Sequence, residues 1–266
     1  MAGTLNVLFI GDIVSQLGRR AVQQVVAKLR KQESLDLVIA NIENLAHGKG
    51  ITKGTLAEIQ NIGIDAFTTG NHVWAQPEGK ELLAEAKNQI IRPANYPPNV
   101  PGRGYCIIKV KTKKVLLINL IGRVFMKLDY DDPFRKFDEI LKEAPKHDEV
   151  IVDFHAEATS EKVAFAWYAA GRASLVVGTH THIPTADAEL LSKHKLGYVT
   201  DVGMVGPKDS ILGVQKDEII EAFLTQLPVK HKMVETGDIV FNSVLAKLKN
   251  HQSIQIKRID MIIEGR

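Results

Sequence analysis

Six short apolar segments of this sequence are each followed at once by polar residues, and this pattern constrains the fold more than any other feature. The segments read LNVLFI, LDLVIANI, IDAFTT, EVIVDF, ASLVV and KLGYVT. Short segments rich in Val, Ile, Leu or Phe are typical of strands that are covered on both faces. Helical patterns lie between them, and strands that alternate with helices predict an α/β fold with much parallel pairing.

Two of the intervening segments carry apolar residues at the spacing of a helix with one buried face. The first follows Gly18 and places on one side Ala21, Val22, Val25, Val26 and Leu29. The second is expected to begin at a Ser160 cap and to end at Gly171. Its expected buried face carries Val163, Trp167 and Ala170.

A third helix and a hairpin complete the expected secondary structure. Asp217 can cap the helix. The residues that this helix is expected to turn inward are Ile219, Ile220, Phe223 and Leu224. The stretch GYCIIKVKTKKVLLINL reads as two strands around residues 111–114, which predicts a hairpin.

Length and composition limit the class of protein. The chain of 266 residues contains no obvious repeat, low-complexity segment or Gly/Ser linker, so residues 1–266 are expected to form one domain. The single cysteine, Cys106, excludes an intrachain disulfide. The apolar stretch at residues 5–10 is too short for a signal peptide or a membrane span, which predicts a cytoplasmic protein without a membrane partner. A net charge of +3, from 34 basic and 31 acidic residues, is too balanced to favour long nucleic acid as a partner.

The polar residues at the strand ends form a set of metal-binding side chains. Ligands of open α/β sheets bind beyond the carboxyl ends of the strands. The donors expected there are Asp12, Glu43, Asn44, Asn71, His155, His180 and His182. Oxygen and imidazole ligands without sulfur suit manganese, iron or zinc better than calcium or magnesium. The set is too large for one four-coordinate zinc and fits two metals that share a ligand.

Such a pair of metals implies hydrolysis at phosphorus. Two metals about 3.5–4 Å apart can hold a bridging water and lower its pKa toward about 7, which yields a hydroxide that attacks the phosphoryl group in line. The leaving oxygen then needs a proton. His72 stands beside the candidate ligand Asn71, and it is the expected general acid.

The arrangement of these motifs resembles a known superfamily. The pieces are Gly11-Asp12, GNH at residues 70–72, the lone His155 and GTHTH at residues 178–182, and they are similar to the metallophosphoesterase (calcineurin-like) superfamily. Two motifs depart from its usual pattern, because the D-x-H motif reads DIV here and the G-D-x-x-D/N motif reads IEN. Both departures resemble the YmdB-like phosphodiesterases. So do the segments FIGDIVSQLGR, NIENLAHGKGIT, GNHVW, RPANYP, DFHAEATSEK, GTHTHIPTAD and TDVGM, which extend the resemblance over nearly the whole chain.

The resemblance implies a single four-layer αββα sandwich with a centre of two divalent or trivalent metal ions. Iron or manganese is expected, with zinc as an alternative. By position, the ligands implied for one metal are Asp12, Glu43, Asn44 and His182. Those implied for the other are Glu43, Asn71, His155 and His180, so that Glu43 bridges the two. The implied reaction is hydrolysis of small cyclic nucleotides, 2′,3′-cyclic and/or 3′,5′-cyclic, by a metal-bridging hydroxide with His72 as general acid, in a homo-oligomer.

Several alternatives stay open from the sequence. The protein can instead be a phosphomonoesterase, an RNA nuclease, or a metal-binding regulatory protein with little turnover. Asp201 either orients a histidine from behind or belongs to a turn before Gly203, and it is left out of the predicted site. Lys49 lies in a Gly-rich segment that either contacts phosphate or is a surface loop. The aromatic residues that either stack on a base or pack in the interior are Trp74, Tyr96 and Phe125.

Overall fold

The computed structural model describes residues 3–265, and its strands form three sheets. The first sheet contains β1 (Leu5–Ile10), β3 (Leu37–Asn41), β4 (Ala66–Thr68), β13 (Ser243–Lys249) and β14 (Gln252–Arg258). Its order is β14-β13-β1-β3-β4, and β1, β3 and β4 are parallel. Their carboxyl ends therefore meet at one edge.

The second sheet contains β5 (Tyr105–Val110), β6 (Lys113–Ile121), β7 (Glu149–His155), β8 (Leu175–Thr179), β9 (Glu189–Leu191) and β10 (Leu196–Val199). Its order is β5-β6-β7-β8-β10-β9. Strands β6, β7, β8 and β10 are parallel, whereas β5 and β6 pair antiparallel and confirm the predicted hairpin.

A third, smaller sheet contains β2 (Asp12–Ile13), β11 (Met204–Pro207), β12 (Ile239–Phe241) and β15 (Met261–Ile263). Its order is β15-β12-β11-β2, and β2 pairs parallel to β11. One residue, Gly11, separates β1 from β2, so the chain passes directly from the first sheet into this one.

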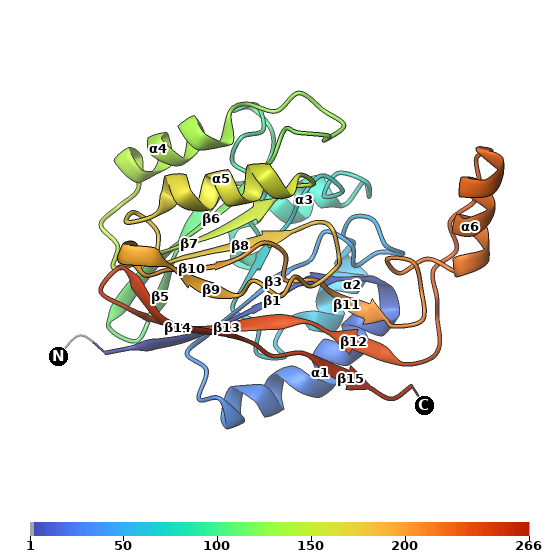
Figure 1. The fold of residues 1–266 in the computed structure, drawn as a ribbon, viewed down its shortest axis with the longest axis horizontal. Coiled ribbons are helices and arrows are strands. Elements are labelled where there is room, and N and C mark those ends of the chain that lie inside the picture. Colours follow the sequence, from blue (N-terminus) through green and yellow to red (C-terminus); the bar gives the residue numbers. More distant parts are fainter. Residues whose placement is uncertain (1–2, 266) are drawn as a thin grey trace.

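The two larger sheets share one apolar core, and helices cover their outer faces (Figure 1). Successive side chains of a strand point to opposite faces. In β1, Val7 and Phe9 accordingly lie in the core between the sheets, whereas Leu8 and Ile10 face the helices. The helices on that outer face are α1 (Ser15–Gln32), α2 (Lys53–Ile59) and α3 (Gly79–Ala84). Those on the second sheet are α4 (Pro133–Glu143) and α5 (Thr159–Ala169).

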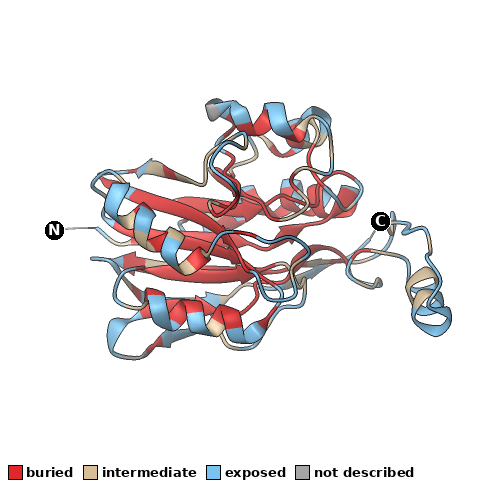
Figure 2. Cartoon of the chain, turned by 90° about the horizontal axis from the view of Figure 1, so that it is seen from above, coloured by how far each residue is buried: buried red, intermediate tan, exposed pale blue. Residues whose placement is uncertain are grey.

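The central strands of the two larger sheets form the buried interior of the molecule, and most helices bury only one side (Figure 2). Two 3-10 helices, Ala86–Asn88 and Ser192–His194, follow α3 and β9. The structure confirms all six predicted strands, the α/β class and the buried face of α1. No helix among residues 3–265 combines the length and the apolar character that crossing a membrane requires.

Two predicted helices differ from expectation. Helix α5 begins after Ala158 without a side-chain cap, so Ser160 is not its cap, and it ends at Ala169. Its buried apolar residues are Phe165, Ala166 and Ala169, while Trp167 is 52% exposed. The prediction placed Val163 and Trp167 on the buried face of this helix. The face that packs against the second sheet instead carries Phe165, Ala166 and Ala169.

Helix α6 (Lys216–Thr225) departs further, because none of its residues is buried. It begins after Gln215 without a side-chain cap, so Asp217 is not its cap. It stands away from the sheets (Figure 1), which leaves Phe223 82% and Leu224 80% exposed. The inward orientation predicted for its apolar residues is wrong, since no sheet face lies against this helix.

Candidate metal centre

The predicted donors converge at the carboxyl ends of the parallel strands in both larger sheets. Asp12 follows β1, the pair Glu43 and Asn44 follows β3, and Asn71 and His72 follow β4. From the second sheet, His155 ends β7, while His180 and His182 follow β8. The face-to-face packing of the sheets places these two sets opposite one another.

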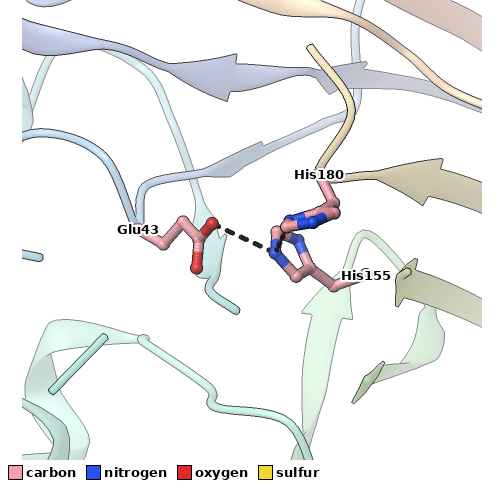
Figure 3. Close-up of side chains that lie close together, drawn as sticks. All are labelled: Glu43, His155 and His180. Carbon is pink, nitrogen blue, oxygen red and sulfur yellow. Dashed lines mark hydrogen bonds and ion pairs between the residues drawn. The ribbon is translucent and has the colours of Figure 1, made fainter. Parts of the chain in front are cut away.

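One group of donors surrounds the Nε2 atom of His155 (Figure 3). Glu43 Oε1 lies 3.0 Å from this nitrogen, and Asn71 Oδ1 and His180 Nδ1 each lie 3.1 Å from it. A single imidazole nitrogen offers one proton or one lone pair and cannot satisfy three such neighbours. Neighbouring ligands of an octahedral ion with bonds of about 2.1 Å lie about 3 Å apart. The group therefore fits a metal ion, and ligand atoms of Glu43, His155 and His180 all lie within 4.8 Å of one another.

A second group surrounds the amide of Asn44. Asn44 Nδ2 lies 3.3 Å from Asp12 Oδ1 and 3.1 Å from His182 Nε2. The same nitrogen lies 3.5 Å from Glu43 Oε1. Glu43 Oε1 thus faces both groups, which is the geometry expected of a carboxylate shared between two metals.

The buried charges of these groups also suit a cation. Burial raises the pKa of Asp12 well above its usual range, and the negative charge of Glu43 adds to this effect. Burial would also raise the pKa of Glu43, but the charge and hydrogen bond of His155 hold it below its usual range. Burial would lower the pKa of His155, yet the neighbouring carboxylates, Glu43 foremost, raise it to about 9. A proton on His155 therefore balances carboxylate charge that a metal ion balances when bound.

The other two histidines are held neutral. Burial and the charge of His155 lower the pKa of His180 to about 3, and burial lowers the pKa of His182. Neutral imidazole is the form that binds metal. Both rings are therefore ready to act as ligands at neutral pH.

Residues outside the predicted set orient two of the imidazoles. His155 Nδ1 lies 2.9 Å from the Thr179 hydroxyl, which donates to Asp153 Oδ1 at 2.7 Å. On the other ring, His180 Nε2 lies 3.0 Å from Glu157 Oε2. Partners of this kind determine which nitrogen faces a metal. Asp153 lies within a strand and Glu157 in a loop, and no pattern in the sequence distinguished either of them.

The loop that carries His180 and His182 is held in an uncommon conformation. Both residues have positive φ, 100° and 66°, a region that non-glycine residues rarely adopt. Between them, the Thr181 N–H and hydroxyl donate to Asp201 Oδ2 at 3.1 and 2.7 Å. The same oxygen accepts a 2.7 Å bond from the buried ammonium of Lys162. The interpretation that Asp201 acts from behind the histidines is thus supported, and its Oδ1 also accepts from the Gly203 N–H in the turn.

Gly70 allows the donors to approach one another. A Cβ atom at this position would collide with His155 Nε2 and Glu43 Oε2. The absence of a side chain therefore leaves room for the group around His155.

His72 lies beside both groups and lines an adjoining cavity of about 800 Å³. Its N–H donates to Glu43 Oε2 at 2.9 Å, and its Nδ1 lies 3.0 Å from Asn44 Oδ1. Burial lowers its pKa. Lys49 lines the same cavity, as the phosphate-contacting interpretation requires.

The three aromatic residues considered for base stacking, Trp74, Tyr96 and Phe125, differ in their surroundings. Tyr96 is buried and packs edge-to-face against Trp74 and Tyr130, with ring centroids 5.7 and 5.0 Å apart. This supports the packing interpretation for Tyr96. Phe125 is 85% exposed in a loop.

The mixed α/β arrangement of sheets and helices places the chain in a fold class that other proteins share. The fold is shared with Haemophilus influenzae NAD nucleotidase, with a TM-score of 0.59 at 17% identity over 99% of this chain and 57% of that one. Within this class the chain belongs to the YmdB-like family, whose model matches residues 8–259.

Two relatives that are at least 30% identical to this chain agree with this assignment. A 2′,3′-cyclic-nucleotide 2′-phosphodiesterase of Bacillus subtilis is 44% identical over 96% of each chain. The crystal structure of a phosphatase from Mycoplasma pneumoniae is 30% identical, with a TM-score of 0.91 over 99% of this chain and 95% of that one. The chain is accordingly an enzyme, a phosphodiesterase-type hydrolase.

Proposed function

We propose that this chain hydrolyses small cyclic nucleotides, 2′,3′-cyclic and/or 3′,5′-cyclic, at a centre of two metal ions. The observation that carries the proposal is the position of Glu43 Oε1, which lies 3.0 Å from His155 Nε2 and 3.5 Å from Asn44 Nδ2. One buried carboxylate oxygen thereby connects donors from both sheets. The 2′,3′-cyclic substrate is supported by the name of the Bacillus subtilis relative.

The proposed ligands follow the two groups. Those of one ion are Asp12, Glu43, Asn44 and His182, and those of the other are Glu43, Asn71, His155 and His180. Iron or manganese is proposed, with zinc as the alternative, because the donors are oxygen and imidazole nitrogen. When bound, the metal pair supplies an activated water and neutralises charge on the phosphoryl oxygens.

His72 is proposed to protonate the leaving ribose oxygen. Its backbone is held by Glu43 and its Nδ1 by Asn44 Oδ1. In the protonated ring, Nδ1–H donates to Asn44, which leaves Nε2–H for the leaving oxygen. The lowered pKa makes His72 a stronger acid, while it reduces the fraction of molecules that carry the proton at pH 7.

A substrate comparison tests the function. Purified protein is loaded with manganese or iron and assayed with nucleoside 2′,3′-cyclic and 3′,5′-cyclic phosphates, a linear dinucleotide and a mononucleotide. We expect turnover of a cyclic substrate, loss of turnover in chelator, and unchanged turnover in the control His251→Ala, which alters an exposed histidine of the β13–β14 turn. Preferred hydrolysis of the mononucleotide would indicate a phosphomonoesterase, and metal-loaded protein without any turnover would indicate a regulatory protein.

The proposal also covers the domain architecture, the oligomeric state and the cellular location of the protein. We infer that residues 1–266 form one domain with a four-layer αββα arrangement, and the three largest core clusters support this order of layers. A homo-oligomer in the cytoplasm is also proposed. Sedimentation of the purified chain tests the oligomeric state.

A further inference from the structure

The cavity beside the candidate metal centre has one polar wall and one mainly apolar wall. One wall carries the centre and its neighbours, including Glu43, His72, His180 and Lys49. The other is formed by residues 211–233, here called the arm, which includes α6 (Figure 1). The apolar residues that the arm contributes are Ile211, Leu212, Val214, Ile219, Phe223, Val229 and Met233.

Phe223 is the most unusual residue of this wall. It lines the cavity and is 82% exposed, so most of its surface is open to solvent. Ile219 lies one helical turn before it and lines the same cavity. An exposed aromatic ring at the rim of a polar centre is suited to a flat apolar ligand, because every nucleobase has a face that can stack on it.

The shape of the cavity limits the ligand further. At about 800 Å³ the cavity lies within the size range of small-molecule sites. A ligand that spans it would present an anionic group to Lys49 and the proposed metal ions and an apolar surface to the arm. A nucleoside phosphate has these two ends on one small molecule.

We propose that Phe223 stacks on the base of the substrate while its cyclic phosphodiester lies at the candidate metal centre. Ile219 and Leu212 complete the apolar surface around the base. The arm is then the element that selects nucleotides over other phosphodiesters. This inference rests on the proposed function, since it assigns a binding role toward the substrate of that reaction.

Leu224 provides a matched control on the same helix. It is 80% exposed and follows Phe223 directly, but it does not line the cavity. Leu224→Ala therefore removes a comparable exposed side chain without touching the proposed base site.

The test compares two cyclic phosphodiesters in metal-loaded protein of verified metal content. One is a nucleoside 2′,3′-cyclic phosphate, and the other is ethylene phosphate, whose hydrolysis is followed by phosphorus NMR and which has a five-membered cyclic ester but no base. In Phe223→Ala, we expect the ratio of kcat/KM for the nucleotide to kcat/KM for ethylene phosphate to fall about 5- to 150-fold, mainly through KM. Phe223→Trp is expected to keep the ratio of the wild type, and so is Leu224→Ala.

The outcomes separate the inference from the proposed function. If the wild type hydrolyses both diesters and Phe223→Ala keeps the ratio, the base site is wrong and the proposed function stands. The same conclusion follows if Phe223→Ala loses both activities equally, because the residue then acts on the fold or the centre. If the metal-loaded wild type hydrolyses neither diester, the proposed function fails, and the inference fails with it.

Discussion

The substitution Asp201→Asn is expected to lower the stability of the protein and its metal content together. Asp201 and Lys162 form an ion pair of 2.7 Å, with exposed side-chain fractions of 0% and 1%. The neutral amide would leave the Lys162 ammonium buried without a counter-charge. Removing one partner of a buried pair lowers the free energy of unfolding by about 3–5 kcal/mol.

The reverse substitution is expected to be milder. In Lys162→Met, the Asp201 carboxylate keeps three donors, namely the Thr181 N–H, the Thr181 hydroxyl and the Gly203 N–H. It loses one hydrogen bond between charged groups, which stabilises by about 1.5–3 kcal/mol. The double variant carries no unpaired cation, so we expect it to be more stable than Asp201→Asn alone.

The metal content changes because the same carboxylate holds the loop of His180 and His182. Both residues have positive φ, and each such conformation costs about 1–3 kcal/mol and persists only where its surroundings hold it. The NH2 group of an Asn at this position must face either the Thr181 donors or the Gly203 N–H, so these bonds cannot all be kept and the loop is expected to relax to ordinary backbone angles. The two imidazoles would then turn away from the other donors.

A second buried ion pair supplies the control. Lys113 and Glu149 are joined at 2.8 Å with exposed fractions of 7% and 0%. Glu149 begins β7 and His155 ends it, so the two are roughly 20 Å apart by strand rise. Glu149→Gln is therefore expected to lower stability by a similar amount while it keeps its metal.

The assay is guanidinium unfolding of chelator-treated protein, followed by circular dichroism and tryptophan fluorescence. Elemental analysis of the reloaded variants gives the metal content. Two results would refute the reasoning. One is a double variant whose loss of unfolding free energy equals the sum of the losses in Asp201→Asn and Lys162→Met. The other is an Asp201→Asn protein that binds as much metal as Glu149→Gln.

Four further predictions concern the centre itself. His72→Ala is expected to keep its metal and to lose turnover by about 10²–10⁴-fold; kinetics and elemental analysis of one sample test this, and full turnover removes His72 from the mechanism. Glu43→Gln is expected to lose metal and turnover together, and two metals per chain in this variant would contradict the shared carboxylate. Gly70→Ala places a Cβ against His155 and Glu43, so metal binding should be lost while circular dichroism stays that of the wild type. Metal affinity of the chelator-treated protein, measured by calorimetry, should rise with pH up to about 9, because His155, whose pKa is raised to about 9, must release a proton to bind metal. A pH-independent affinity would exclude this proton release.

The strands and their polar ends could be predicted because both are local features of the sequence. A short apolar segment followed by Glu43-Asn44 or by His180-Thr181-His182 shows where a strand ends, and parallel pairing brings such ends to one edge. The structure brings the predicted donors together, with Glu43 and His180 beside His155 and with His182 beside Asn44. Their roles as metal ligands stay predictions.

The remaining features could not be predicted because they depend on contacts between distant residues. Lys162 lies 39 residues before Asp201, and nothing near either residue in the sequence indicates their pairing. Helix α6 shows a different limit. Apolar periodicity indicates that Ile219 and Phe223 share a face, but it does not indicate whether that face meets a sheet or an open cavity.

Asn44 lies between the proposed proton donor and two of the other proposed ligands. Its Nδ2 lies 3.3 Å from Asp12 Oδ1 and 3.1 Å from His182 Nε2, whereas its Oδ1 lies 3.0 Å from His72 Nδ1. Of the two polar atoms of this amide only Oδ1 can bind a metal ion, and its second lone pair can accept from the protonated His72 ring at the same time. A displacement of Asn44 on the ligand side therefore also moves His72, because the same amide holds its ring.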